Sequence, residues 1–192
     1  MFWLIIGLVI FLGAHSIRIF ADDWRSRQIT RLGPQVWKAL YALFSLTGLA
    51  LVIRGFEQAR QHPLLVWSPP PWTAHLAALF TVVAFILLVA AYVPRNRIKV
   101  GIGHPMVVGV QLWAIGHLLA TGMLRDEVLF GGLLIWAIVD FVAARRRDRI
   151  AGVQASPGTA TGDITTLLIG IVAWAAFALW LHGPLIGVRP FA

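Results

Sequence analysis

The sequence contains no cysteine and few charged side chains. Among its 192 residues, aspartate, glutamate, lysine and arginine together make up 12%. The lack of cysteine excludes disulfide bonds, thiolate metal ligands, a cysteine nucleophile and covalent attachment of haem. Glycine-rich phosphate loops, zinc-protease helices and serine nucleophile elbows are missing as well. So little charge also leaves a small surface suited to water.

Apolar residues dominate instead. They make up 59% of the chain, and the mean hydropathy is +0.80, whereas soluble domains are roughly 45–50% apolar. Six apolar segments are long enough to cross a hydrocarbon core of roughly 30 Å as helices. The sequence therefore predicts an all-α, polytopic transmembrane bundle of six helices that forms a single domain over residues 1–192. The segments are Phe2–Phe20, Lys38–Phe56, Trp72–Val93, Pro105–Thr121, Val128–Ala144 and Ile164–His182.

The positive charge is concentrated between the apolar segments. The net charge is +8, and most of the 16 lysines and arginines lie in or beside the first, third and fifth links. The positive-inside rule places these links in the cytoplasm, so both termini are expected outside. This distribution is a topology signal, and no nucleic-acid-binding module accompanies it. We therefore expect a multi-pass membrane protein, with lipid and not nucleic acid as its partner.

Two histidines lie inside apolar segments, His15 in the first and His117 in the fourth. Ionisable side chains at membrane depth are costly and usually mark functional sites. Arg18 and Asp22 follow His15 at i+3 and i+7, which puts them near one face of a continuous helix. Trp113 precedes His117 by four residues and shares its face. Two interpretations stay open: metal or haem ligation, with Arg18 pairing an acidic group, or hydrogen bonds between helices.

Two further residues complicate the choice of site. His104 opens the segment that contains His117, and a straight helix separates the two by about 20 Å. Both therefore cannot ligate one haem, and depth favours His104 as the partner of His15, because both are expected near the cytoplasm. Asp140, near the cytoplasmic end of the fifth segment, is a candidate to pair with Arg18 or with an arginine among residues 145–149.

Five strings resemble the NnrU family of bacterial membrane proteins. The family is named after genes linked to nitrite and nitric oxide reduction in denitrifying bacteria. The resemblance implies an inner-membrane protein tied to denitrification, with components of nitric oxide reductase as partners. The strings are GAHSIRIF at 13–20, RLGPQVWKALYALFSLTGL at 31–49, LVWSPPPW at 65–72, AAYVPRNRIK at 90–99 and HPMVVGVQLWAIGHLLATG at 104–122.

The same strings are distantly similar to zeta-carotene isomerase, an integral membrane enzyme that uses haem b with histidine ligation. Its early His-Ser pair looks like His15-Ser16, and its HP-x-x-x-G motif with a later histidine looks like His104-Pro105 through His117. This resemblance implies haem b with His15 and His117 as the iron ligands. The isomerase has a cysteine three residues before the later histidine, where this chain has Ala114, so chemistry that uses that thiol is not implied.

The leading prediction is thus a haem-b-binding protein that serves electron transfer, gas sensing or isomerisation. Whether it is an enzyme stays open. One alternative is a non-enzymatic accessory protein that helps assemble nitric oxide reductase, in which the histidines only hydrogen-bond between helices. Another is a small-solute transporter, which would need more polar groups at mid-depth than Thr47 and Gln111.

Overall fold

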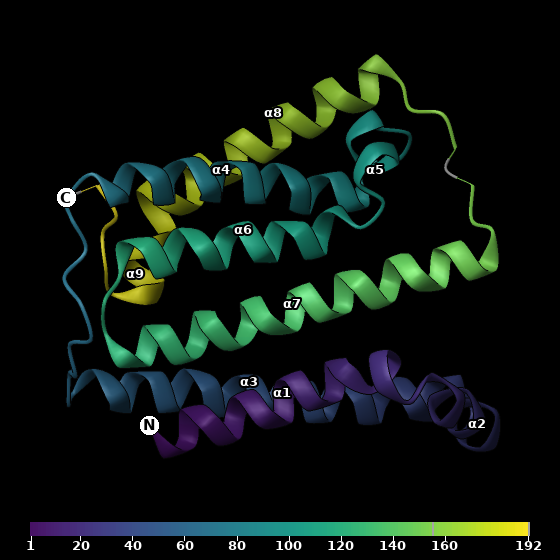
Figure 1. Ribbon diagram of the computed structural model, residues 1–192, viewed down its shortest axis with the longest axis horizontal. Helices are drawn as coiled ribbons and strands as arrows, with labels where there is room; N and C mark the ends of the chain where they lie inside the picture. Colours follow the sequence, from purple (N-terminus) through teal and green to yellow (C-terminus); the bar gives the residue numbers. More distant parts are fainter. Residues whose placement is uncertain (155, 192) are drawn as a thin grey trace. The chain divides into compact units, whose positions relative to one another are not determined.

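The computed structural model describes residues 1–154 and 156–191, and its regular structure there is helical (Figure 1). A single isolated β-bridge interrupts this pattern within the described residues. The predicted all-α class is therefore confirmed. In chain order the elements are α1 Phe2–Phe20, α2 Asp22–Leu32, α3 Pro34–Arg60, α4 Thr73–Tyr92, α5 Arg97–Ile102, α6 Pro105–Ala120, α7 Leu124–Ala151, α8 Ala160–Ala176, the π-helix η1 Phe177–Leu181 and α9 His182–Ile186.

Within the described residues, five helical stretches are long and apolar enough to cross a membrane, so the predicted count of six is not confirmed. They are α1, α3, α4, α7 and the continuous run Ala160–Ile186, whereas α6 is shorter, at 16 residues. Large apolar side chains on these helices are open to the surroundings: Leu43, Phe44 and Leu46 of α3 are all more than half exposed. Such surfaces suit lipid better than water. The chain thus has the make-up of a multi-pass membrane protein.

Backbone contacts divide the chain into two compact units. Unit 1 comprises Met1–Ser68 and Thr121–Asp140, and unit 2 comprises Pro69–Ala120 and Phe141–Ala192. In unit 1, α1 packs along α3 around a core of Leu4, Leu8 and Val52. The prediction of one domain stays a prediction, because each unit is assembled from two separate stretches of the chain.

The proline-rich link after α3 is fixed against the link between α6 and α7. Val66 N donates to Gly122 O over 2.8 Å, and Leu124 N donates to Leu64 O over 2.8 Å. The indole Nε1 of Trp67 also donates to the Glu127 carboxylate, at 3.2 Å. Two links that the charge pattern places on the same, outer side therefore lie together in unit 1.

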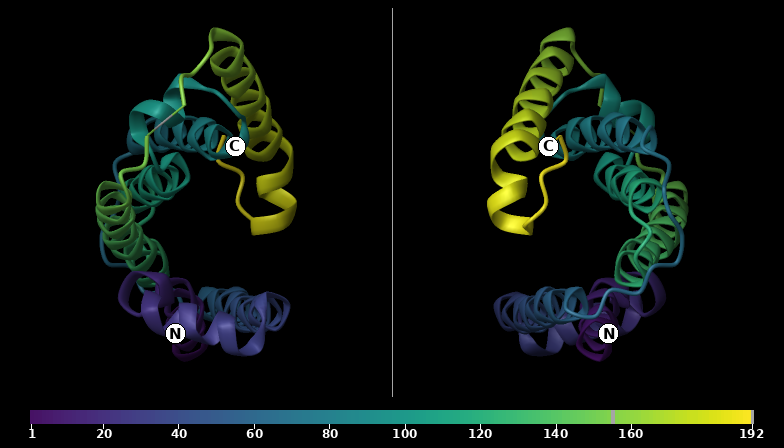
Figure 2. Two further views of the ribbon diagram at one scale, coloured as in Figure 1. Left: turned by 90° about the vertical axis from the view of Figure 1, so that its right-hand side faces the viewer. Right: turned by 90° about the vertical axis from the view of Figure 1, so that its left-hand side faces the viewer.

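In unit 2, α4 packs against both α6 and α8, which lie on either side of it (Figure 2). Two glycines bring the backbones close. A Cβ on Gly170 would lie 2.7 Å from Ile86 Cα, and one on Gly109 would lie 3.0 Å from Ala84 O. Small residues are what membrane helices need in order to approach each other this closely. Beyond α8 the chain winds as the π-helix η1, ahead of Pro184, whose missing N–H cannot bond the carbonyl one turn earlier.

The two basic links of unit 2 are joined by hydrogen bonds. Thr159 N and Thr159 Oγ1 donate to Arg95 O, at 2.6 and 3.2 Å. Asn96 is 1% exposed, and its amide donates to the carbonyls of Ala90 and Val93, at 2.9 and 2.6 Å. Its Oδ1 accepts from Lys99 N at 2.7 Å, which caps α5. One buried side chain therefore holds the end of α4 and the start of α5 together.

We expect Asn96→Ala to lower the free energy of unfolding by about 2 kcal/mol, because buried polar groups left without partners each cost roughly 1–3 kcal/mol. Asn96→Asp is the matched variant: it keeps the oxygen that caps α5 but places a buried carboxylate oxygen against the carbonyls of Ala90 and Val93, which only accept, so it should lose at least as much stability as Asn96→Ala. Denaturant titration in detergent, followed by tryptophan fluorescence, measures both. Equal stability of Asn96→Ala and the wild type would contradict this role.

Candidate functional site

His15 lies on α1, five residues before the helix ends, and its ring is half-buried in unit 1. Its Nδ1 is 2.7 Å from the carbonyl oxygen of Phe11, one turn earlier. A carbonyl oxygen only accepts, so Nδ1 carries the proton, and in the neutral ring Nε2 carries the lone pair. This hydrogen bond orients the imidazole and fixes its tautomer, as the outer hydrogen bond of a metal-ligating histidine does.

Aromatic rings surround His15. The ring centroid of Phe11 lies 4.3 Å away, that of Tyr41 on α3 5.3 Å, and that of Trp136 on α7 5.9 Å. Within the described chain, the buried Nε1 of Trp136 has no hydrogen-bond partner. His15 thus combines an acceptor nitrogen with three aromatic neighbours, one of which has an unsatisfied N–H donor.

The prediction that His15, Arg18 and Asp22 share one helix face is wrong for Asp22. Helix α1 ends at Phe20, because Ala21 leaves the helical conformation with φ −139° and ψ 42°. Asp22 begins α2, where a carboxylate is favourable beside the positive end of the helix, and it pairs with Arg25 at 3.5 Å. Arg18 stays on α1, exposed and already engaged with a neighbouring group.

His117 lies on α6 in unit 2, and Trp113 lies on the same face of that helix, as the spacing predicts. Its Nδ1 is 2.8 Å from the carbonyl oxygen of Trp113, and the two ring centroids are 5.0 Å apart. By the same reasoning as for His15, Nδ1 is the donor and Nε2 carries the lone pair. The two histidines therefore share a hydrogen bond to the carbonyl oxygen four residues earlier, each within its own unit, and His117 has a further interaction besides.

His104, the other candidate on the α6 side, has a different environment. Its Nε2 is 2.7 Å from an oxygen of Asp148 on α7, and its ring meets Phe141 edge-on at 6.4 Å. The structure thus commits Nε2 of His104 to a carboxylate. Asp140, in turn, lies near enough to Tyr41 to interact with it electrostatically, and it has a further partner of its own.

No group of three or more histidine, aspartate or glutamate side chains that would hold a bare metal ion occurs among residues 1–154 and 156–191. Haem makes a smaller demand, because the porphyrin supplies four nitrogens and the protein only the axial ligands. Single histidines such as His15 and His117 are enough for that purpose.

The family model described as NnrU protein matches residues 3–190. The chain belongs to the NnrU family. None of the curated proteins and none of the solved structures gives a significant match. The resemblance seen in the sequence strings is thus confirmed at the level of the family, and it extends to α7, α8 and α9, which the strings did not cover.

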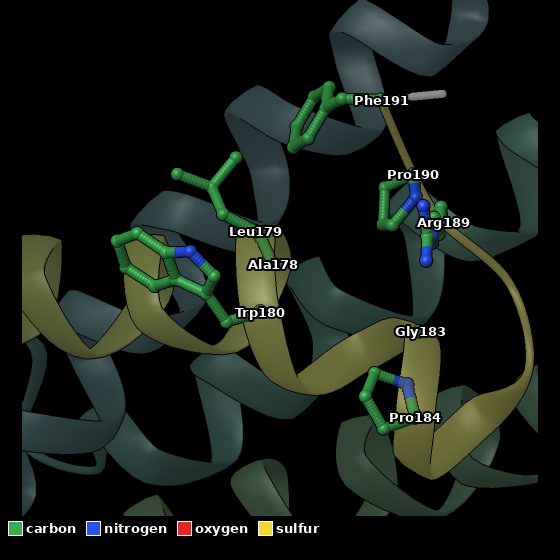
Figure 3. Close-up of a pocket in the computed structure, with 8 residues that line it drawn as sticks. All are labelled: Ala178, Leu179, Trp180, Gly183, Pro184, Arg189, Pro190 and Phe191. Carbon is green, nitrogen blue, oxygen red and sulfur yellow. The ribbon is translucent and has the colours of Figure 1, made fainter.

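This NnrU family member also has a hollow near its C-terminal end, with a volume of about 450 Å³. Figure 3 shows Leu179 and Trp180 on one side of it and Arg189 with Pro190 on the other. Among the described residues that line it, Arg189 is the single ionisable one, and its side chain packs against Gly183 at the start of α9. The hollow offers no histidine, so it does not bear on iron ligation.

Three site residues escaped the sequence analysis: Tyr41, Trp136 and Asp148. Each reaches its histidine from another helix. The spacing along one helix reveals partners at i±4, which is how Trp113 was found, but it carries no information on contacts between helices. The sequence does indicate Asp148, because it is the one carboxylate within the run of arginines at residues 145–149, and such a carboxylate is expected to pair with a basic side chain.

Proposed function

We propose that this NnrU family member binds haem b in the bacterial inner membrane, with His15 and His117 as iron ligands, and that it serves the respiration of nitrogen oxides. The observation that carries the proposal is the shared hydrogen bond of the two histidines. In each, Nδ1 donates to the carbonyl four residues earlier, at 2.7 and 2.8 Å. This arrangement presents Nε2 in its basic form, which is the form that ligates iron.

The same reasoning favours His117 over His104 as the second ligand. Nε2 of His104 meets Asp148 at 2.7 Å, so ligation through that nitrogen would leave a partly buried carboxylate without its partner. Depth in the membrane favours His104, but hydrogen bonding and the resemblance to the histidine-ligated isomerase both favour His117. We therefore assign His104 to an ion pair and His117 to the iron.

Other residues near His15 suit the remaining parts of a haem. Phe11, Tyr41 and Trp136 supply flat apolar walls, and the unsatisfied Nε1 of Trp136 is a donor for a polar edge. Arg18, one turn after His15, is exposed at the end of α1, where a guanidinium pairs well with a carboxylate such as a propionate. Haem b, when bound, supplies an iron centre that carries one electron or binds a diatomic gas.

The hydrogen bonds between links support the proposed topology. The third and fifth links, both basic, are joined through Arg95 and Thr159 in unit 2, and the second and fourth links are joined through Leu64 and Leu124 in unit 1. Links that meet lie on one side of a membrane. We propose that the basic pair faces the cytoplasm and both termini face outward, as the positive-inside rule requires.

The connection to denitrification comes from the family. NnrU proteins are named after genes of nitrite and nitric oxide reduction, and components of nitric oxide reductase are the proposed partners. Haem with two histidine ligands would suit the transfer of electrons to such a partner. The substitution of alanine at position 114, where the isomerase has cysteine, makes isomerase chemistry the weaker alternative.

The test is an absorption spectrum of the full-length protein, purified in detergent, in its oxidised state and after reduction with dithionite. We expect a Soret band, and sharp, split α and β bands on reduction, as for iron with two histidine ligands. A colourless protein that takes up no added haemin would overturn the proposal. That outcome would favour the accessory role, in which the histidines hold helices together and the protein helps assemble nitric oxide reductase.

A further inference from the structure

Four cations gather around a second hollow in unit 2, at the basic links. The hollow has a volume of about 720 Å³ and is bordered by α5, the end of α7 and the segments next to them. Arg95, Lys99, Arg145 and Arg149 contribute side chains to its lining. No ion pair involves any of the four in the described part of the chain. The described lining of the hollow thus carries four cationic residues against one carboxylate, that of Asp148.

The acidic groups nearby are already in use. Asp148, which also lines the hollow, meets His104 at 2.7 Å. Asp163 accepts from Arg97 N at 2.6 Å and lies 3.7 Å from Arg97 Nε, outside the lining of the hollow. Like charges around one hollow repel each other, and an anion bound between them relieves that repulsion. The hollow is therefore a place of high positive potential that an external anion would neutralise.

The backbone at Arg95 has an uncommon conformation that hydrogen bonds hold in place. Arg95 has φ 55°, a left-handed conformation that is uncommon outside glycine and that tends to occur at functional sites. It is held there by two hydrogen bonds from Thr159 to its carbonyl oxygen. A Cβ on Gly162 would lie 2.5 Å from the same oxygen, so α8 presses directly on this turn. The position of Arg95 is thus set by the fold rather than by solvent.

Glycine also makes room for a cation on the other side of the hollow. Gly103 has φ +80°, and a Cβ there would lie 2.7 Å from Nη1 of Arg145. The guanidinium of Arg145 therefore rests where a side chain at position 103 would stand. Lys99 is fixed too, since its Nζ donates to the carbonyl oxygen of Ala91 at 2.8 Å. Two of its three N–H groups remain for a ligand.

We propose that this hollow binds a phosphate group at the membrane surface. Guanidinium groups match phosphate oxygens in pairs, and an ammonium group adds a point charge. Three arginines and one lysine around one hollow supply more positive charge than chloride or a lone carboxylate needs, and they suit a phosphate monoester or diester. Because the hollow lies at the ends of helices long enough to cross a membrane, a phospholipid headgroup and a soluble phosphate compound both reach it.

The experiment compares variants of the full-length protein by thermal unfolding and uses no haem signal, so its result is independent of the haem proposal. The variants are Arg145→Gln with Arg149→Gln, and separately Lys99→Gln on α5. Arg146→Gln is the matched control: it lies on α7 between the two arginines but does not line the hollow. One arm compares vesicles of phosphatidylcholine with vesicles of phosphatidylcholine mixed with phosphatidic acid, and the other titrates inorganic phosphate into protein in detergent.

We expect either phosphatidic acid or inorganic phosphate to raise the unfolding temperature of the wild type and of Arg146→Gln, and the rise should reach a plateau at high concentration. The double variant and Lys99→Gln should bind at least about tenfold more weakly, as the loss of charge-assisted hydrogen bonds predicts. Stabilisation by phosphatidic acid alone identifies a lipid headgroup, and stabilisation by inorganic phosphate identifies a soluble ligand. No stabilisation in either arm, or an equal effect on Arg146→Gln and the double variant, would overturn the proposal.

Discussion

Gly55→Leu should force α1 away from α3 and remove the packing that holds unit 1 together. A Cβ on Gly55 would collide with the backbone nitrogen of Leu4. At Gly7 it would lie 2.5 Å from Val52 N, and at Gly48 it would lie 2.7 Å from Phe11 N. Three glycines along one seam thus place the backbones of two helices in contact, and Leu4 is fully buried beside them. The obstacle is backbone in every case, so no side chain can turn aside to make room.

The expected loss is larger than that of ordinary overpacking, which costs typically 1–3 kcal/mol. Here the helices must separate, so at least about 3 kcal/mol is expected, and the variant should unfold at a much lower denaturant concentration. Gly13→Leu is the matched control, because it adds the same side chain to the same pair of helices at a position with nothing within 4 Å. Denaturant titrations of both variants in detergent make the comparison. If Gly55→Leu unfolded at the wild-type denaturant concentration, the close seam between α1 and α3 would be refuted.

The sequence was a good guide to the helices that meet lipid. The predicted span Phe2–Phe20 is the observed α1, and Pro105–Thr121 differs from α6 by one residue. Length and hydropathy suffice here, because a chain in hydrocarbon must satisfy its backbone polar groups within a helix. The predicted number of six membrane spans is not confirmed. Five of the described helices are long and apolar enough to cross a membrane, and α6, with 16 residues, is shorter than these.

Hydropathy was a poor guide where helices leave the apolar region. The predicted span Val128–Ala144 ends before the arginines at residues 145–149, whereas helix α7 continues through them to Ala151. Likewise α3 runs from Pro34 to Arg60, beyond both ends of the predicted span Lys38–Phe56. Arginine and lysine favour helix nearly as much as alanine does, so a change from apolar to basic residues does not end a helix. The same reasoning explains why α2, a polar helix of 11 residues, was expected as part of a link.

In the candidate site, contacts within one helix could be predicted from the sequence, and contacts between helices could not. The contact between Trp113 and His117 follows from helical spacing alone, and it is present. The neighbours of His15 from other helices, Tyr41 and Trp136, depend on the packing of α1 on α3 and of α7 on α1, which no single segment encodes. The close approach of α1 and α3 at Gly7, Gly48 and Gly55 could not be predicted either, because the sequence does not show which two helices pack together.

The substitution His15→Ala or His117→Ala should abolish the low-spin haem spectrum. If His15 and His117 hold the haem iron as proposed, each change would take away one of its two protein ligands, and the six-coordinate spectrum would become five-coordinate. Changes in the outer hydrogen bonds of a metal ligand already cost roughly 10–100-fold in affinity, so the loss of a ligand should leave at least about tenfold less haem bound. Absorbance at the Soret maximum per mole of purified protein measures it.

Two further variants make this result specific. His62→Ala removes an exposed histidine in a link and should leave the spectrum unchanged. Imidazole added to His15→Ala should restore the six-coordinate spectrum, because the missing ligand is small enough to be replaced from solution, whereas a general failure to fold is not repaired in this way.

His104→Ala decides between the two candidates on the α6 side: it should keep the spectrum, since the Nε2 of His104 is engaged with Asp148 at 2.7 Å. Loss of the spectrum in His104→Ala, together with its retention in His117→Ala, would reverse the assignment of the second ligand.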